Sequence, residues 1–103
     1  MIARTWRART TAANAPVYAK HFTDTVVPQL KSLSGHRGAH LLRRDSGSRV
    51  EFVALTLWDS RSSIEAFAGK DISRSHVEPA GQAALESFDD FADHYDVVVS
   101  SAV

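Results

Sequence analysis

The stretch RRDSGSRVEFVALTLWDSRSSIEAF, residues 43–67, carries three structural signals in succession. Its DSGS segment has the composition of a hairpin turn, with a glycine where a positive φ is cheap. Residues 50–58 are rich in β-branched and aromatic side chains and predict a strand. Ser60 or Ser62 can cap a following helix, and Ser62 with Glu65 fits a capping box. The stretch therefore predicts a turn, a strand and a helix.

The sequence before this stretch adds three elements. Residues 37–44 predict the partner strand of the hairpin, and residues 2–8 alternate well enough for a first strand. Apolar side chains that recur every four residues predict an amphipathic helix over about 13–33. Pro28 lies inside that helix and is expected to end or kink it, because proline lacks the amide hydrogen that a helix needs.

A last helix over residues 79–88 and a final strand over residues 94–103 complete the order β-α-β-β-α-β. This is the ferredoxin-like α+β arrangement, with a four-stranded antiparallel sheet and both helices on one face. Neither face of the strand over 50–58 is polar throughout. A small sheet that is apolar on both sides needs a second cover, and we expect a second copy of the chain in a two-fold dimer. Trp6 is expected to pack in that dimer interface.

Composition narrows the function classes. The 103 residues form a single expected domain, 1–103, and the 12 basic and 12 acidic side chains cancel, which argues against nucleic-acid binding. No apolar run approaches the roughly 20 residues that span a bilayer. The N-terminus lacks the apolar core of a signal peptide, so we expect a cytoplasmic protein. The absence of cysteine excludes thiolate catalysis, and no metal-binding motif occurs. Nine Arg against three Lys hint at a GC-rich bacterial genome.

The order of elements resembles a known family, the antibiotic-biosynthesis-monooxygenase superfamily. The segment PQLKSLSGHRGAHLLRRDSGSRVEFVALTLWDSRSSIEAF, residues 28–67, and the downstream DISRSH…P carry the resemblance. It implies a dimeric α+β barrel with a small-molecule cleft between sheet and helices in each subunit. Its members include cofactor-free oxygenases of aromatic polyketides and quinols, and haem-degrading enzymes.

The resemblance also implies site residues. In the polyketide-oxidising type the tryptophan before the helix lines the substrate pocket, and Trp58 matches it, as a candidate for both catalysis and substrate binding. The asparagine, tyrosine and arginine of that type fall on Ala54, Ile64 and Glu78 of this chain, which do not match. In the haem-degrading type the helix tryptophan is replaced here by Phe67. Its iron-binding histidine falls within about one residue of His76. No cofactor is expected in the oxygenase interpretation, and haem is the alternative.

The chemistry of a cofactor-free oxygenase points to histidine. Such an enzyme deprotonates an electron-rich phenol, anthrone or quinol so that the resulting anion can give an electron to O₂. Histidine is the side chain that titrates nearest to neutral pH. His76 is the candidate base, because its position and the resemblance agree. His40, on the second strand, is a candidate substrate contact. Tyr18 and Phe22 belong to the core stripe of the first helix and can also roof the cleft, together with Phe67.

Two hypotheses remain from the sequence. The first is a homodimeric, cofactor-independent monooxygenase that acts on a small aromatic metabolite and O₂. The second is a non-catalytic dimer of the same fold that binds a small ligand or haem. The three mismatched positions favour the second, and the family resemblance favours the first.

Overall fold

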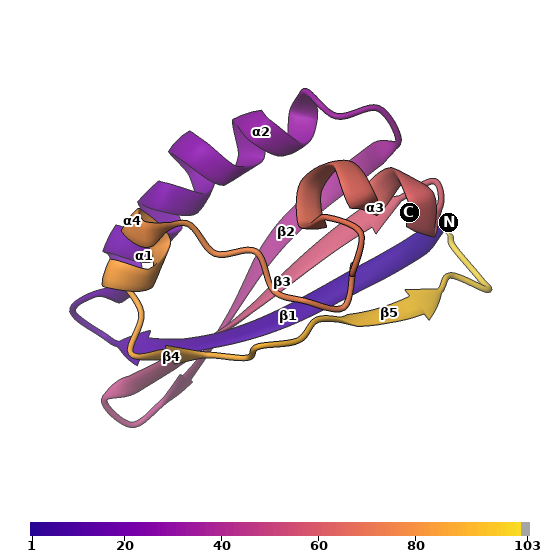
Figure 1. Cartoon of the computed structure of the whole chain (residues 1–103). Helices are drawn as coiled ribbons and strands as arrows, with labels where there is room; N and C mark the ends of the chain where they lie inside the picture. The colour runs from indigo at the N-terminus through magenta and orange to yellow at the C-terminus, as the bar shows by residue number, and fades with distance from the viewer. Residues whose placement is uncertain (102–103) are drawn as a thin grey trace.

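The predicted hairpin forms one side of the sheet, with β2 at the edge and β3 inside. The computed structural model describes residues 1–101 of the chain. Strands β2 (His36–Ser46) and β3 (Arg49–Trp58) pair antiparallel, and β3 pairs antiparallel with β1 (Ile2–Thr11). The edge position beside β1 is shared by β4 (Ser87–Phe88) and β5 (Asp93–Asp96), one near each end of β1. The five strands therefore occupy four positions in the order β2-β3-β1-β4, which confirms the predicted ferredoxin-like fold (Figure 1).

The first helical region runs through Pro28 instead of ending there. It consists of α1 (Ala15–His21), a π-helical turn η1 (Phe22–Val26) and α2 (Val27–Lys31). In the π turn the amide of Val27 donates to the carbonyl of Phe22, one residue farther back than in an α-helix. Pro28 then stands in the first turn of α2, where a missing amide hydrogen costs little. The widened turn thus absorbs the proline that we expected to end or kink the helix.

Helix α3 (Arg61–Ala68) is capped by Ser60, one of the two predicted cap residues, but through a capping box other than the predicted one. Ser60 adopts extended backbone angles and its hydroxyl accepts from the amide of Ser63. The hydroxyl of Ser63 in turn accepts from the amide of Ser60, at 3.3 Å. The capping box is therefore Ser60 with Ser63, and the predicted pair of Ser62 with Glu65 is wrong.

The C-terminal elements are shorter than predicted. Helix α4 (Pro79–Ala83) stops early because the following residues turn onto the edge of β1, where Thr10 Oγ1 donates to the Ala84 carbonyl at 2.8 Å. Strand β5 covers only part of the predicted 94–103. Its last residue pairs with Ile2, the first residue of β1, so the partner strand runs out. Residues 102–103 of the predicted strand lie outside the described residues.

The helices cover one face of the sheet (Figure 1). Along β1 the buried residues are those that point toward this layer: Ile2, Arg4, Trp6, Ala8 and Thr10. The opposite face carries side chains that are exposed in the single chain, such as Leu42 and Tyr95. Among residues 1–101, no helix has the length and apolar character to cross a membrane.

Candidate functional site

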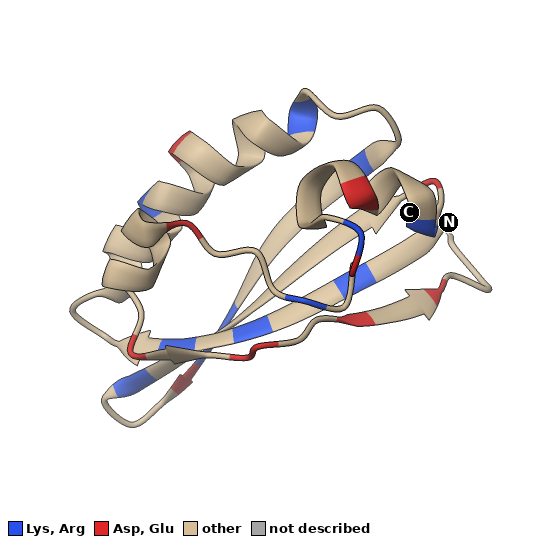
Figure 2. Cartoon of the chain, in the orientation of Figure 1, with Lys and Arg blue, Asp and Glu red and all other residues tan. Residues whose placement is uncertain are grey.

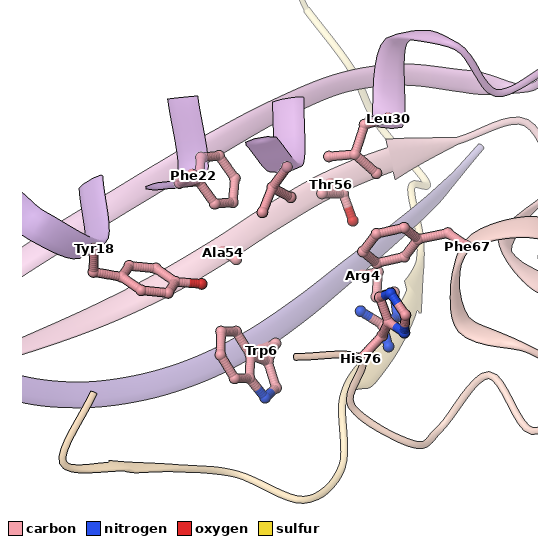
Figure 3. Close-up of a pocket in the computed structure, with 10 residues that line it drawn as sticks. Arg4, Trp6, Tyr18, Phe22, Leu30, Ala54, Thr56, Phe67 and His76 are labelled. Atoms are coloured by element: carbon pink, nitrogen blue, oxygen red, sulfur yellow. The ribbon is translucent and has the colours of Figure 1, made fainter. Parts of the chain in front are cut away.

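A cavity of about 40 Å³ lies between the sheet and the helices. The register of β1 and β3 sets its floor, because Arg4 pairs with Thr56 and Trp6 pairs with Ala54. Figure 3 shows the side chains of the first helical region on the other side of this space, with Phe67 and His76 near Arg4 at one end. The remaining lining residues come from the first helical region, α3 and the segment after α3: Tyr18, Phe22, Val26, Leu30, Phe67 and His76.

Phe67 and His76 separate this cavity from an outer depression. Their rings meet edge to face, with centroids 5.0 Å apart and planes at 69°. Both residues also line a surface depression of about 310 Å³, together with Gln29, Ser32, Leu33 and Ala66. This ring pair is therefore the barrier that a ligand entering the cavity from the depression has to displace.

The segment that carries His76 is tied to the edge of the sheet. Between β4 and β5 the chain leaves β1 and pairs with residues 73–75 instead, through an isolated bridge between Arg74 and Phe91. The amide of Ser75 donates to the Asp90 carbonyl at 2.9 Å, and the amide of Ala92 donates to the Ser73 carbonyl at 2.7 Å. His76 itself is exposed at the end of this pairing.

Two aromatic side chains that line the cavity, Trp6 and Tyr18, each carry a hydrogen-bond donor. The indole Nε1 of Trp6 donates to the carbonyl of Asp89 at 2.7 Å, which fixes the ring. Trp6 was expected in a dimer interface, but it lies on the helix-covered face and lines the cavity. The hydroxyl of Tyr18 points toward the interior of the group of side chains in Figure 3. Burial raises the pKa of Tyr18 to about 12, so its hydroxyl stays a hydrogen-bond donor at neutral pH.

Arg4 is the charged group of the lining. It is 5% exposed, and its Nη2 donates to the carbonyls of Arg74 at 2.9 Å and Ile72 at 3.4 Å. Its Nε is buried and has no hydrogen-bond partner. The guanidinium carbon lies 5.7 Å from the centre of the Phe67 ring. Burial lowers the pKa of Arg4 to about 10, which still leaves it charged at neutral pH.

Arg4 differs from the other two arginines of β1 in its charged partners. Arg7 and Arg9 point to the other face and form ion pairs with Asp93 and Asp89, at 3.7 and 2.5 Å. Figure 2 shows this row of basic residues on β1 beside acidic residues of the edge. Among residues 1–101, no acidic side chain lies within ion-pair distance of Arg4.

His94 of β5 is the cross-strand neighbour of Arg4. Its Nε2 is buried without a hydrogen-bond partner. Burial lowers the pKa of His94, the charges of Arg4 and Arg61 lower it further, and Asp93 opposes them. The sequence analysis did not select Arg4 or His94 as site residues. An arginine that alternates with Ile2 and Trp6 on one strand face was the signal for Arg4.

Of the predicted site residues, Tyr18, Phe22, Phe67 and His76 meet at the cavity. Trp58 is fully buried and does not line the cavity. Its ring packs 6.1 Å from that of Phe67, so it lies directly behind the wall. His40 is exposed on β2 opposite Leu55, on the sheet face turned away from the cavity.

Solved structures share this fold over their whole length. A candidate antibiotic biosynthesis monooxygenase from Bacillus cereus has a TM-score of 0.68 and 14% identity, with coverage of 99% of this chain and 97% of that one. A second, from Deinococcus radiodurans, has a TM-score of 0.63 and 10% identity, with coverage of 100% and 98%. The chain has the fold of the antibiotic biosynthesis monooxygenases. The predicted resemblance is thereby confirmed at the level of the fold.

A haem-degrading protein shares the same monooxygenase fold. MhuD from Mycobacterium tuberculosis, solved with two haems in its active site, has a TM-score of 0.65 and 20% identity and covers 99% of this chain and 100% of its own. No family model matches the chain, and no curated protein matches it in sequence.

A porphyrin does not fit the cavity of this monooxygenase fold as it stands. The space of about 40 Å³ holds a few water molecules, so neither a porphyrin nor a single aromatic ring enters it unless Phe67 and His76 move apart. Among residues 1–101, no group of three His, Cys, Asp or Glu side chains is placed to hold a metal ion.

Proposed function

We propose that the protein is a cofactor-independent monooxygenase that acts on a small aromatic metabolite with O₂. The observation that carries the proposal is an imidazole, that of His76, at the mouth of a cavity walled by aromatic side chains. Flat apolar walls favour a planar ring, and a few convergent polar groups fix its orientation.

His76 is the proposed base. It is exposed to solvent on one side and lines the cavity on the other, so it can take a proton from a bound phenol or activated CH₂ group and pass it to water. The Tyr18 hydroxyl donates to the oxygen on which negative charge develops. With an anthrone-type substrate, the CH₂ group and O₂ give a carbonyl and water, so no external reductant is needed. Phe22 and Phe67 hold the ring and exclude water.

Trp58 acts through its neighbours in this proposal. Its Nε1 donates to Thr56 Oγ1 at 2.9 Å, and Thr56 lines the cavity. Its packing against Phe67 sets the wall that faces the substrate. The proposed role of Trp58 is to position these two residues.

We also infer a homodimer through the open sheet face. On that face Leu42 is 48% exposed on β2, beside half-buried side chains of β3, and Tyr95 is 54% exposed on β5 at the opposite edge of the sheet. Exposed apolar side chains on a sheet face favour a partner, and a two-fold axis lets the same face meet itself.

The alternative is a non-catalytic ligand-binding protein of the same fold. Ala54 lines the cavity and cannot donate a hydrogen bond, while Ile64 is buried and Glu78 precedes α4. These three positions are where the resemblance implies asparagine, tyrosine and arginine. A chain that binds aromatic molecules without consuming O₂ would match this alternative.

Oxygen uptake separates the two functions. Chelator-treated protein is given a panel of anthrones and hydroquinones, and O₂ consumption is compared with the rate without protein. The proposal expects uptake that falls by about 10²–10⁴-fold in His76→Gln, the usual contribution of a general base. His40→Gln tests the second candidate histidine and should keep its rate, because its side chain faces away from the cavity. Equal rates in His76→Gln and the unmodified protein would overturn the assignment of the base.

A further inference from the structure

Arg4 carries a buried charge that has no carboxylate partner among residues 1–101. Burying an unpaired charge is costly, and proteins normally offset the cost with an ion pair and full hydrogen bonding. Arg4 has two backbone carbonyls on Nη2 and nothing on Nε. Each of its neighbours on the same strand, Arg7 and Arg9, has a carboxylate partner.

The carbonyl contacts hold the guanidinium in place. Nη2 bonds to Ile72 and Arg74, which lie in the segment leading to His76. The ring of Phe67 lies within cation–π distance, so the plane of the group is fixed from two sides. The guanidinium of Arg4 is therefore held in a fixed orientation in the cavity wall, and its buried Nε keeps a hydrogen that no other group accepts.

We propose that Arg4 binds a carboxylate carried by the aromatic ligand of this cavity. The inference rests on the proposed function in so far as both concern the same ligand. A carboxylate is planar and singly charged, which suits one planar guanidinium with a free donor. A phosphate would call for more positive charge, and Arg4 is the one arginine or lysine among the ten lining residues.

The arrangement also orients the ligand. Arg4 and His76 both lie against Phe67, at 5.7 Å from guanidinium carbon to ring centre and 5.0 Å between ring centres. A ring stacked in the opened cavity can place its carboxylate at Arg4 while a hydroxyl reaches His76. The proposed substrate class is therefore an aromatic acid with a phenolic or quinol hydroxyl.

A matched pair of ligands tests this inference without any mutation. 2,5-Dihydroxybenzoate and 2,5-dihydroxybenzamide have the same ring and nearly the same shape but differ in charge. Binding to the full chain is measured by calorimetry under argon at pH 7.5, where the acid is ionised. We expect the acid to bind at least about tenfold more tightly, as for a charge-assisted hydrogen bond. Equal affinities, tighter binding of the amide, or no binding of either ligand at 10 mM would overturn the proposal.

Variants then test whether Arg4 is the residue that causes the tighter binding of the acid. Arg4→Gln should lose the preference for the acid, and Arg7→Gln, on the other face of the same strand, should keep it. Circular dichroism shows whether each variant is folded. If Arg4→Gln does not fold, Arg4→Lys is used, which keeps the charge but not the fork of donors and should reduce the preference. A preference that persists in folded Arg4→Gln would overturn the assignment.

The outcome is independent of oxygenase activity. Selective binding of the acid without O₂ uptake would reject the proposed function and leave the role of Arg4 standing. O₂ uptake with equal rates and affinities for neutral and acidic quinols would do the reverse.

Discussion

The indole Nε1 of Trp58 donates a hydrogen bond of 2.9 Å to Thr56 Oγ1, two residues back on the same strand face. Thr56 lines the cavity and Trp58 does not. The two side chains therefore divide a supporting role from a contacting one, and this division can be tested by substitution.

Trp58→Phe should weaken stability more than ligand binding. The change keeps an aromatic ring in the core but leaves the buried Thr56 hydroxyl without its donor, at a cost of about 1–3 kcal/mol. Trp58→Ala should cost about 3–5 kcal/mol through the cavity it creates. Urea unfolding followed by circular dichroism measures both values.

Trp6→Phe is the matched control, because Trp6 lines the cavity. It should weaken binding of 2,5-dihydroxybenzoate more than Trp58→Phe does. If Trp58→Phe has the larger effect on binding in a folded protein, Trp58 contacts the ligand and its supporting role is wrong.

Gly35→Ala should destabilise the fold by well over 2 kcal/mol. Gly35 has a φ of +87°, and an added Cβ would lie 2.6 Å from Cβ of Ser63, the residue that completes the α3 cap. A left-handed backbone alone costs a non-glycine residue about 1–2 kcal/mol. Gly47→Ala isolates this backbone cost, because its φ is +61° and nothing lies within 4 Å of the added atom. Equal unfolding free energies for the two variants would show that the contact with Ser63 is relieved cheaply.

Stability should fall as the pH drops below about 6.5, the pKa of an unfolded histidine. Burial, and then the charges of Arg4 and Arg61, lower the pKa of His94, with Asp93 opposing them. The unfolded chain then binds a proton before the folded chain does, so the free energy of unfolding decreases below the unfolded pKa of about 6.5. His36, whose pKa is lowered first by burial, contributes in the same direction.

The variant His94→Gln should flatten this pH dependence. Urea unfolding at several pH values gives the slope for each protein, with His40→Gln as the control for loss of an exposed histidine. An unchanged slope in His94→Gln would mean that His94 does not contribute to the pH dependence of the unfolding free energy.

Leu42→Asp should convert a dimer into monomers. The substitution places a charge on the open sheet face, in register with Val53 of β3. Val17→Asp is a matched control on the helical layer, where the side chain is similarly exposed. Sedimentation velocity measures the mass of each. If the unmodified protein sediments as a monomer, the inferred dimer is wrong.

The sequence predicted the order of elements well because the signals are local. The hairpin turn, the β-branched strand and the serine-capped helix each depend on residues close together in the chain. The predicted end or kink at Pro28 was wrong because a π turn precedes the proline. That turn depends on how the helix packs on the sheet, which no local sequence pattern reports. The final strand was overlong because its end is set by Ile2, more than ninety residues away.

The candidate site was only partly predictable for the same reason. Tyr18 and Phe22 follow from helical spacing. Alternation along β1 groups Arg4 with Trp6, but it does not say which strand face the helices cover. Trp58 matched a family pattern by its position in the sequence. Its burial depends on Leu30 of α2 and Ile64 of α3, which pack against it.

The edge between β4 and β5 has a consequence for the placement of the proposed base. A strand at the edge of a sheet pairs through half of its backbone groups and leaves the other half unpaired on its outer side. Here the carbonyl of Asp90 and the amide of Ala92 face outward and bind residues 75 and 73. A change that shifted residues 90–92 by one position along the edge would turn these groups away from the segment and release the imidazole of His76.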